Sequence, residues 1–182
     1  MKGITDKHLY DVTLNIEDNA IKTISVIWNC NYITTNKVDN RFSKIDGLFI
    51  RDNIIKGIYE VKTRTQTYSW FKDYKSMIIS YDKITDGAII SRILNTPFFA
   101  IFRTSCKRIL VFQITDNNGN LICPMNIRYT ETQKSSTFDK GLNNKKIIAN
   151  AYLMLDDNPN LFIFNEEQYE SRVLEKYGSN DK

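Results

Sequence analysis

Asp46, Glu60 and Lys62 are the residues of this sequence best suited to chemistry at a metal ion. Glu60 and Lys62 stand two residues apart in a β-prone run, so in a strand both side chains project from the same face. Two carboxylates on neighbouring strands can share a hard divalent cation, and Mg²⁺, with Mn²⁺ as a substitute, binds a few carboxylates while keeping several waters. The carbonyl of Val61 could add a ligand, and Lys62 could contact an attacking water or a phosphate.

These groups converge only if the chain around them folds as a β-hairpin. Residues 48–50 and 58–63 are β-prone runs, and the Arg-Asp-Asn sequence between them is typical of a turn. Strands joined by so short a connection are antiparallel neighbours. If the turn centres near Asn53, Asp46 lies opposite Glu60 or its immediate neighbour. The sequence therefore predicts one compact polar cluster.

The remaining pattern predicts an α/β or α+β domain, with helices packed on a sheet. We expect one domain over residues 1–182, with a core at about 15–114 and C-terminal strands and a helix over 121–178. Predicted helices cover 16–28 (with Asn15 as N-cap), 69–81, 83–94 and 166–177. Predicted strands fall at 32–36, 98–102, 108–114, 121–129, 147–155 and 161–164, with a polar loop over 130–145.

Composition excludes several classes of protein. With 42% hydrophobic and 25% charged residues the chain is expected to be globular and soluble. No apolar run approaches the roughly 20 residues that span a bilayer, and residues 1–10 lack the pattern of a secretory signal, so we expect a cytoplasmic protein. Three widely spaced cysteines and a single histidine argue against a disulfide framework and against zinc. The net charge of +4 permits nucleic-acid binding without requiring it.

Two segments resemble a known signature. Residues 43–47 (SKIDG) followed by 58–62 (IYEVK) resemble the D…E-x-K motif of the PD-(D/E)XK nuclease superfamily, which includes restriction endonucleases, Holliday-junction resolvases and small phage nucleases. The resemblance extends over about residues 15–103, where the predicted order of elements is similar to the αβββαβ core of the restriction-endonuclease-like fold. Ile45 replaces the proline of the motif, and no Q-x-x-x-Y pattern follows Lys62.

This resemblance implies a Mg²⁺-dependent endodeoxyribonuclease that hydrolyses DNA phosphodiester bonds and leaves a 5′-phosphate. Asp46, Glu60 and the Val61 carbonyl would bind the metal, and Lys62 would position the water. Glu17, in the helix before the first strand, would assist at the metal directly or through water. Such an enzyme could be phage-type or junction-resolving, and a homodimer is expected if it cuts both strands or resolves junctions.

Four cations that follow the motif could contact DNA phosphates. They are Arg64, Lys72, Lys75 and Lys83. Lys83 starts a predicted helix, where the helix N-terminus would support anion binding. Between these cations, Trp70 and Tyr74 could stack on bases, although their helical spacing is also typical of core positions.

Plainer interpretations of the same residues remain open at this stage. Glu60 and Lys62 could form cross-strand ion pairs on a solvated face. Glu17 fits the first turn of a helix on electrostatic grounds alone, and the lysines could simply solvate a helix face. A nuclease fold could also serve DNA binding or particle assembly without catalysis.

Overall fold

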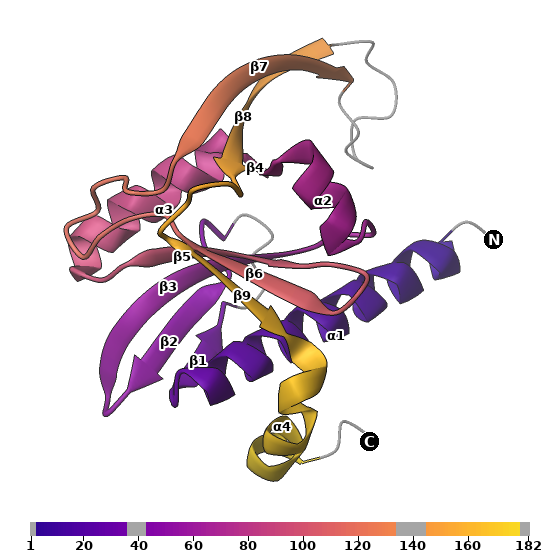
Figure 1. Cartoon of the computed structure of the whole chain (residues 1–182), viewed down its shortest axis with the longest axis vertical. Coiled ribbons are helices and arrows are strands. Elements are labelled where there is room, and N and C mark those ends of the chain that lie inside the picture. Colours follow the sequence, from indigo (N-terminus) through magenta and orange to yellow (C-terminus); the bar gives the residue numbers. More distant parts are fainter. Residues whose placement is uncertain (1–2, 36–42, 134–144, 179–182) are drawn as a thin grey trace.

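Two β-sheets and the helices around them form an α+β fold in the computed structural model, which describes residues 3–35, 43–133 and 145–178 (Figure 1). Within these residues the larger sheet is mixed, with strand order β1-β2-β3-β5-β6-β9, and the smaller is antiparallel, with order β4-β8-β7. β3 and β5 are parallel, and the other neighbours are antiparallel. No helix among the described residues is long and apolar enough to cross a membrane.

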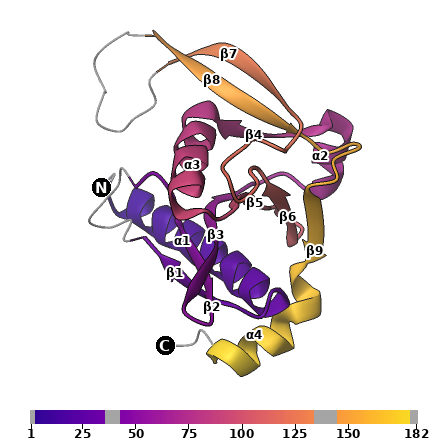
Figure 2. The same ribbon diagram turned by 90° about the vertical axis from the view of Figure 1, so that its left-hand side faces the viewer.

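The helices lie mainly in the first half of the chain, and the second half consists mostly of consecutive strands. The first part contains α1 (Gly3–Ile27), β1 (Asn31–Thr34), β2 (Gly47–Arg51), β3 (Ile54–Thr63), α2 (Tyr68–Tyr74), β4 (Ser76–Ser80) and α3 (Tyr81–Leu94). The second part contains β5 (Phe98–Arg103), β6 (Arg108–Gln113), β7 (Met125–Gln133), β8 (Lys145–Met154), β9 (Leu161–Asn165), a 3₁₀ turn (Glu166–Tyr169) and α4 (Glu170–Tyr177). Figure 2 shows β7 and β8 as a long ribbon that extends from the body of the protein above α3.

The β2–β3 hairpin has the register predicted from the sequence. Gly47 pairs with Tyr59, and the backbone N–H of Asp46 donates to the Tyr59 carbonyl at 2.9 Å, so Asp46 meets β3 at Glu60. Residues 52 and 53 both have positive φ, at 55° and 60°, which gives a two-residue turn whose twist suits a hairpin. Aspartate and asparagine tolerate this conformation better than most residues.

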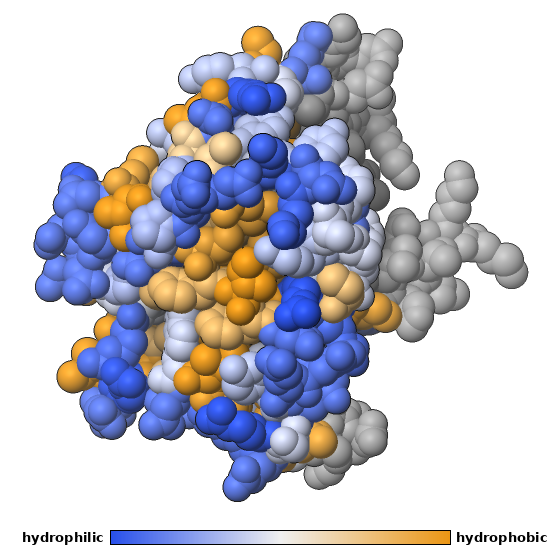
Figure 3. Space-filling model, viewed as in Figure 1, coloured by the Kyte–Doolittle hydropathy of each residue, from blue (hydrophilic) through white to orange (hydrophobic). Residues whose placement is uncertain are grey.

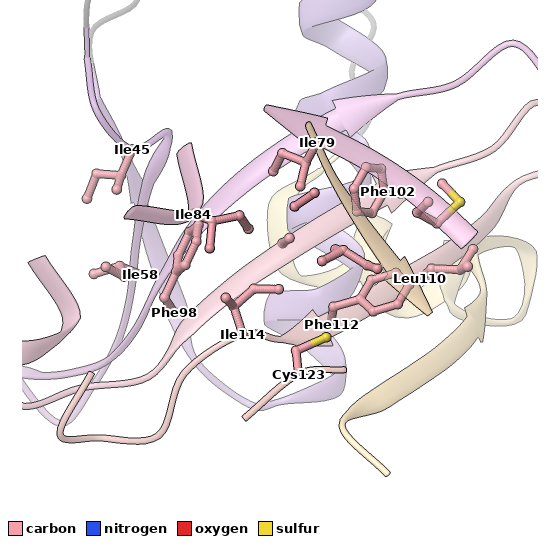
Figure 4. Packing of buried hydrophobic residues seen from close by; sticks show 14 of the residues in the cluster. Ile45, Ile58, Ile79, Ile84, Phe98, Phe102, Leu110, Phe112, Ile114 and Cys123 are labelled. Carbon is pink, nitrogen blue, oxygen red and sulfur yellow. The ribbon is translucent and has the colours of Figure 1, made fainter. Parts of the chain in front are cut away.

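Apolar side chains cover both faces of the larger sheet. On the α1 side, Ile21 and Ile24 pack against Tyr59 and Ile101. On the α3 side, apolar residues of β3, α3, β5 and β6 form a second cluster (Figure 4). Both faces of β5 are covered, which explains its continuous apolar sequence. Figure 3 shows further apolar side chains in the middle of the face that β9 crosses, and the exposed large apolar residues of β9 are Phe162 and Ile163.

Two boundaries of the predicted helices are wrong. α1 begins at Gly3, so Asn15 lies inside the helix and does not cap it. The chain between Gly3 and Asn15 contains neither proline nor a second glycine, so no residue there stops the helix. The helix predicted over 69–81 ends at Tyr74, because Lys75 adopts a left-handed conformation with φ 59°.

The segment that follows Lys75 is β4, which pairs with β8. Trp70 and Tyr74, on the short helix α2, lie on the surface with 41% and 61% of their area exposed. Their rings stack with the ring centroids 4.3 Å apart. The interpretation of these two aromatics as core residues is therefore wrong. Of the loop predicted over 130–145, residues 130–133 belong to β7 and residue 145 to β8, and residues 134–144 lie outside the described residues.

Candidate metal centre

Asp46, Glu60 and Lys62 lie together where β2 begins beside β3. The Nζ of Lys62 is 2.7 Å from Oε1 of Glu60 and 3.9 Å from Oδ2 of Asp46. The backbone N–H of Val61 donates to Oδ2 of Asp46 at 2.8 Å, which fixes this carboxylate against β3. Both carboxylate residues are buried, with exposures of 5% for Asp46 and 1% for Glu60. The cluster predicted from the hairpin is therefore present, and it is not a solvated surface ion pair.

Glu60 occupies a costly position for a carboxylate. It precedes Val61 in the middle of β3, pairs with Ala100 of β5, and belongs to the face that carries the apolar Ile58. Burial raises the pKa of Glu60 above its ordinary value, Lys62 opposes this shift, and Asp46 adds to it. A charge at such a site is tolerated only when it is paired or binds a cation.

Lys83 is a partner of Glu60 that the sequence did not reveal. Its Nζ donates to Oε2 of Glu60 at 3.1 Å and to the backbone carbonyl of Ser43 at 3.0 Å. We expected Lys83 to contact phosphate, but its ammonium group here contacts the carboxylate cluster. Nothing in the local sequence could predict this contact, because it depends on how α3 packs against β3.

Glu17 reaches the other side of β3. A pocket of about 400 Å³ lies between α1 and the sheet, and Glu17, which is buried, lines it together with Asp46. The complete lining is Leu14, Asn15, Glu17, Asp18, Ile21, Thr34, Thr35, Asp46, Tyr59 and Val61. The structure thus brings Glu17 to the same pocket as Asp46, whereas Glu60 does not line it.

Tyr59 presents an unusual group to this pocket. Its hydroxyl is buried and has no hydrogen-bond partner among the described residues. Burial raises the pKa of Tyr59, and the neighbouring Asp46 raises it further. Gly47 is required beside it, because a Cβ there would collide with the Tyr59 ring and with the backbone oxygen of Ile33.

The carboxylates at this site suit magnesium better than a softer metal. No group of three or more His, Cys, Asp or Glu residues within the described ranges is arranged to hold a metal ion. Within the cluster, the carboxylates of Asp46 and Glu60 are oxygen ligands of the kind that suits an ion which retains several waters. Oε1 of Glu60 forms an ion pair with Nζ of Lys62 at 2.7 Å, so a cation bound to this buried oxygen would share it with the lysine or displace the lysine.

The other predicted phosphate-binding residues differ in their surroundings. The guanidinium of Arg64 donates to the carbonyl of Ile78 at 2.6 Å and lies 5.2 Å from the Phe102 ring centre, and burial lowers its pKa. Lys72 is exposed on α2, and Lys75 is exposed 3.6 Å from Asp156. Arg64 and Lys83 are therefore bound within the protein, whereas Lys72 and Lys75 face solvent.

Comparison of the chain with models of protein families, with curated proteins and with solved structures finds no match. The resemblance to PD-(D/E)XK nucleases thus depends on the residues and on the order of elements in this chain. A fold supports many functions, so a functional argument has to come from the chemistry of the site.

Proposed function

We propose that the protein is a Mg²⁺- or Mn²⁺-dependent nuclease of the PD-(D/E)XK type that hydrolyses phosphodiester bonds of DNA. The observation that carries this proposal is the convergence of buried Asp46 and Glu60 on Lys62, at 3.9 Å and 2.7 Å. Buried ion pairs stabilise proteins little, and apolar replacements often do better. Chemistry explains such a cluster more simply than stability does.

The order of elements supports the same proposal. α1 precedes three antiparallel strands, and β5 returns parallel to β3 after α3. This order agrees with the αβββαβ core that the motif implies, with β4 and α2 placed between β3 and α3. Asp46 directly precedes β2 and Glu60 lies within β3, which agrees with the positions of the carboxylates in the motif.

In this proposal each residue has a defined task. Asp46, Glu60 and the Val61 carbonyl hold the cation, which when bound supplies Lewis acidity and lowers the pKa of a water. Lys62, about a third exposed, is within reach of both carboxylates and contacts the attacking water or the phosphate. Glu17, across the pocket from Asp46, assists through water.

Cleavage assays test the proposal directly. Wild type, Glu60→Ala and Lys62→Met are incubated with supercoiled plasmid, linear duplex, single strands and a four-way junction, in Mg²⁺, Mn²⁺ or EDTA. We expect cleavage in either metal, none in EDTA, and a loss of at least about 100-fold in both variants. Glu175→Ala, which removes an exposed carboxylate of α4, is the matched control and should cleave as wild type does. Activity that survives Glu60→Ala would contradict the assignment.

A second function is favoured by one observation, the pairing of Glu60 with two lysines. Lys62 and Lys83 together offset the charge of Glu60 within the protein, without any metal ion. A nuclease fold kept for DNA binding or for particle assembly could retain this arrangement. DNA binding without cleavage in either metal would favour this alternative over the enzyme.

A further inference from the structure

The ammonium group of Lys83 is held by oxygens from two separate segments. Its Nζ is 3.0 Å from the Ser43 carbonyl and 3.5 Å from the Lys44 carbonyl, both in the chain that leads to Asp46. The third oxygen is Oε2 of Glu60, at 3.1 Å. Lys83 thereby connects residues 43–44, which precede β2, to Glu60 of β3.

The first turns of α3 provide a fixed base for this contact. Ile84, the next residue, is fully buried in the apolar cluster on that side of the sheet. One turn further along α3, Asp86 pairs with Lys44 at 2.6 Å, and this pair is more exposed. An exposed ion pair contributes little to stability, so the contacts of Lys83 hold α3 to residues 43–44 more firmly than the Asp86–Lys44 pair does.

The two oxygens of Glu60 have different lysine partners. Oε2 accepts a hydrogen bond from Lys83 at 3.1 Å, whereas Oε1 forms an ion pair with Lys62 at 2.7 Å. Lys83 therefore fixes one oxygen and leaves the other turned toward Lys62. Metal ligands are commonly oriented in this way by a hydrogen bond from a neighbouring residue.

We propose that Lys83 is a positioning residue, which orients Glu60 directly and Asp46 through residues 43–44. This inference rests on the proposed metal centre. It differs from the expectation that Lys83 contacts phosphate, because it assigns the ammonium group to the protein's own carboxylate.

Three roles for Lys83 predict different changes in cation affinity when no nucleic acid is present. If Lys83 is only a nearby positive charge, its removal relieves repulsion and the cation binds more tightly. If it serves phosphate alone, cation affinity stays unchanged. If it positions Glu60, cation affinity falls.

Calorimetric titration of the whole chain with Mn²⁺ separates these roles. We expect Lys83→Met to weaken Mn²⁺ binding about 10-fold or more, and Lys83→Arg, which keeps donors and charge, to recover part of the loss. Lys56→Met is the matched control. It removes one exposed lysine charge from β3, the strand that carries Glu60, and should leave Mn²⁺ affinity unchanged. Circular dichroism confirms that each variant is folded.

The outcomes distinguish this inference from the proposed function. Mn²⁺ binding by wild type with equal or tighter binding by Lys83→Met overturns the role of Lys83 alone. Failure of wild type to bind Mn²⁺ overturns the metal centre and this inference together. If Lys83→Met does not fold, Lys83→Gln, whose shorter and uncharged side chain does not reproduce the ammonium contacts, decides in its place, since Mn²⁺ affinity equal to or tighter than that of wild type would contradict positioning.

Discussion

The two faces of β3 differ in what they contribute to the protein. Toward α1, Tyr59 and Val61 join an apolar cluster that includes Ile101. Toward α3, Glu60 and Lys62 bring charge into a largely apolar neighbourhood. One strand thus carries packing on one face and an ionic cluster on the other.

The two faces differ in whether their buried side chains stabilise the fold. Apolar burial on the α1 face stabilises the fold in proportion to the area removed from water. The charges on the α3 face lose hydration and regain only part of it from their partners. Truncation of an apolar side chain on the α1 face should therefore lower the free energy of unfolding, whereas removal of the buried charge on the α3 face should raise it.

The largest effect is expected on the apolar face. Ile101→Ala removes a fully buried side chain of β5 and should lower the free energy of unfolding by about 2–5 kcal/mol, because it leaves a cavity. Urea denaturation measures the change. Ile54→Ala, at the exposed end of the hairpin, is the control and should cost less than about 0.5 kcal/mol. Equal losses at both positions would show that the α1 face is not a packed core.

An intermediate effect of opposite sign is expected at Glu60. Burial raises the pKa of Glu60 above its unfolded value, so the folded protein binds this proton more tightly and loses stability as pH rises through the folded pKa. Glu60→Gln cannot ionise, and Lys62 and Lys83 are partly exposed and remain hydrated. We expect Glu60→Gln to be about 1–2 kcal/mol more stable than wild type at neutral pH.

The pH dependence provides the decisive part of this measurement. Urea denaturation from about pH 4 to about pH 8 should show the advantage of Glu60→Gln growing as pH rises and nearly vanishing at the acid end. Glu175→Gln, an exposed substitution, should show no such trend. A Glu60→Gln variant that is less stable than wild type at neutral pH would mean that the lysines stabilise the carboxylate more than burial penalises it.

The position of the charged face could be predicted because its determinants are local. The turn at residues 52–53 fixes the hairpin register to within one residue, and a register shift between Phe49 and Ile50 then places Asp46 beside Glu60. The resemblance to PD-(D/E)XK nucleases implied that Glu17 lies near the site, and Glu17 lines the pocket that Asp46 also lines.

Other features could not be predicted, because they depend on distant contacts or on a weak local signal. Lys83 meets Glu60 only when α3 packs on the sheet. α2 ends at Tyr74 because the next residue, Lys75, adopts a left-handed conformation. This conformation is more usual for glycine or asparagine, so the sequence gives no sign that the helix stops here. Without that signal, the helical spacing of Trp70 and Tyr74 with the residues of β4 predicted one long helix.

The smallest effect is expected at Tyr59, whose buried hydroxyl is a polar group on the apolar face. An unpaired buried hydroxyl loses its hydration without compensation, so Tyr59→Phe should raise the free energy of unfolding by about 1 kcal/mol. Tyr177→Phe is the matched control, because its hydroxyl pairs with Ser25 at 2.7 Å and its removal should lower stability by a similar amount. A loss of stability in Tyr59→Phe would contradict this expectation and would mean that a water or ligand in the pocket satisfies the hydroxyl. The pocket beside α1, where Glu17 and Asp46 already meet, would then bind through Tyr59 as well, and packing and binding would overlap on that face of β3.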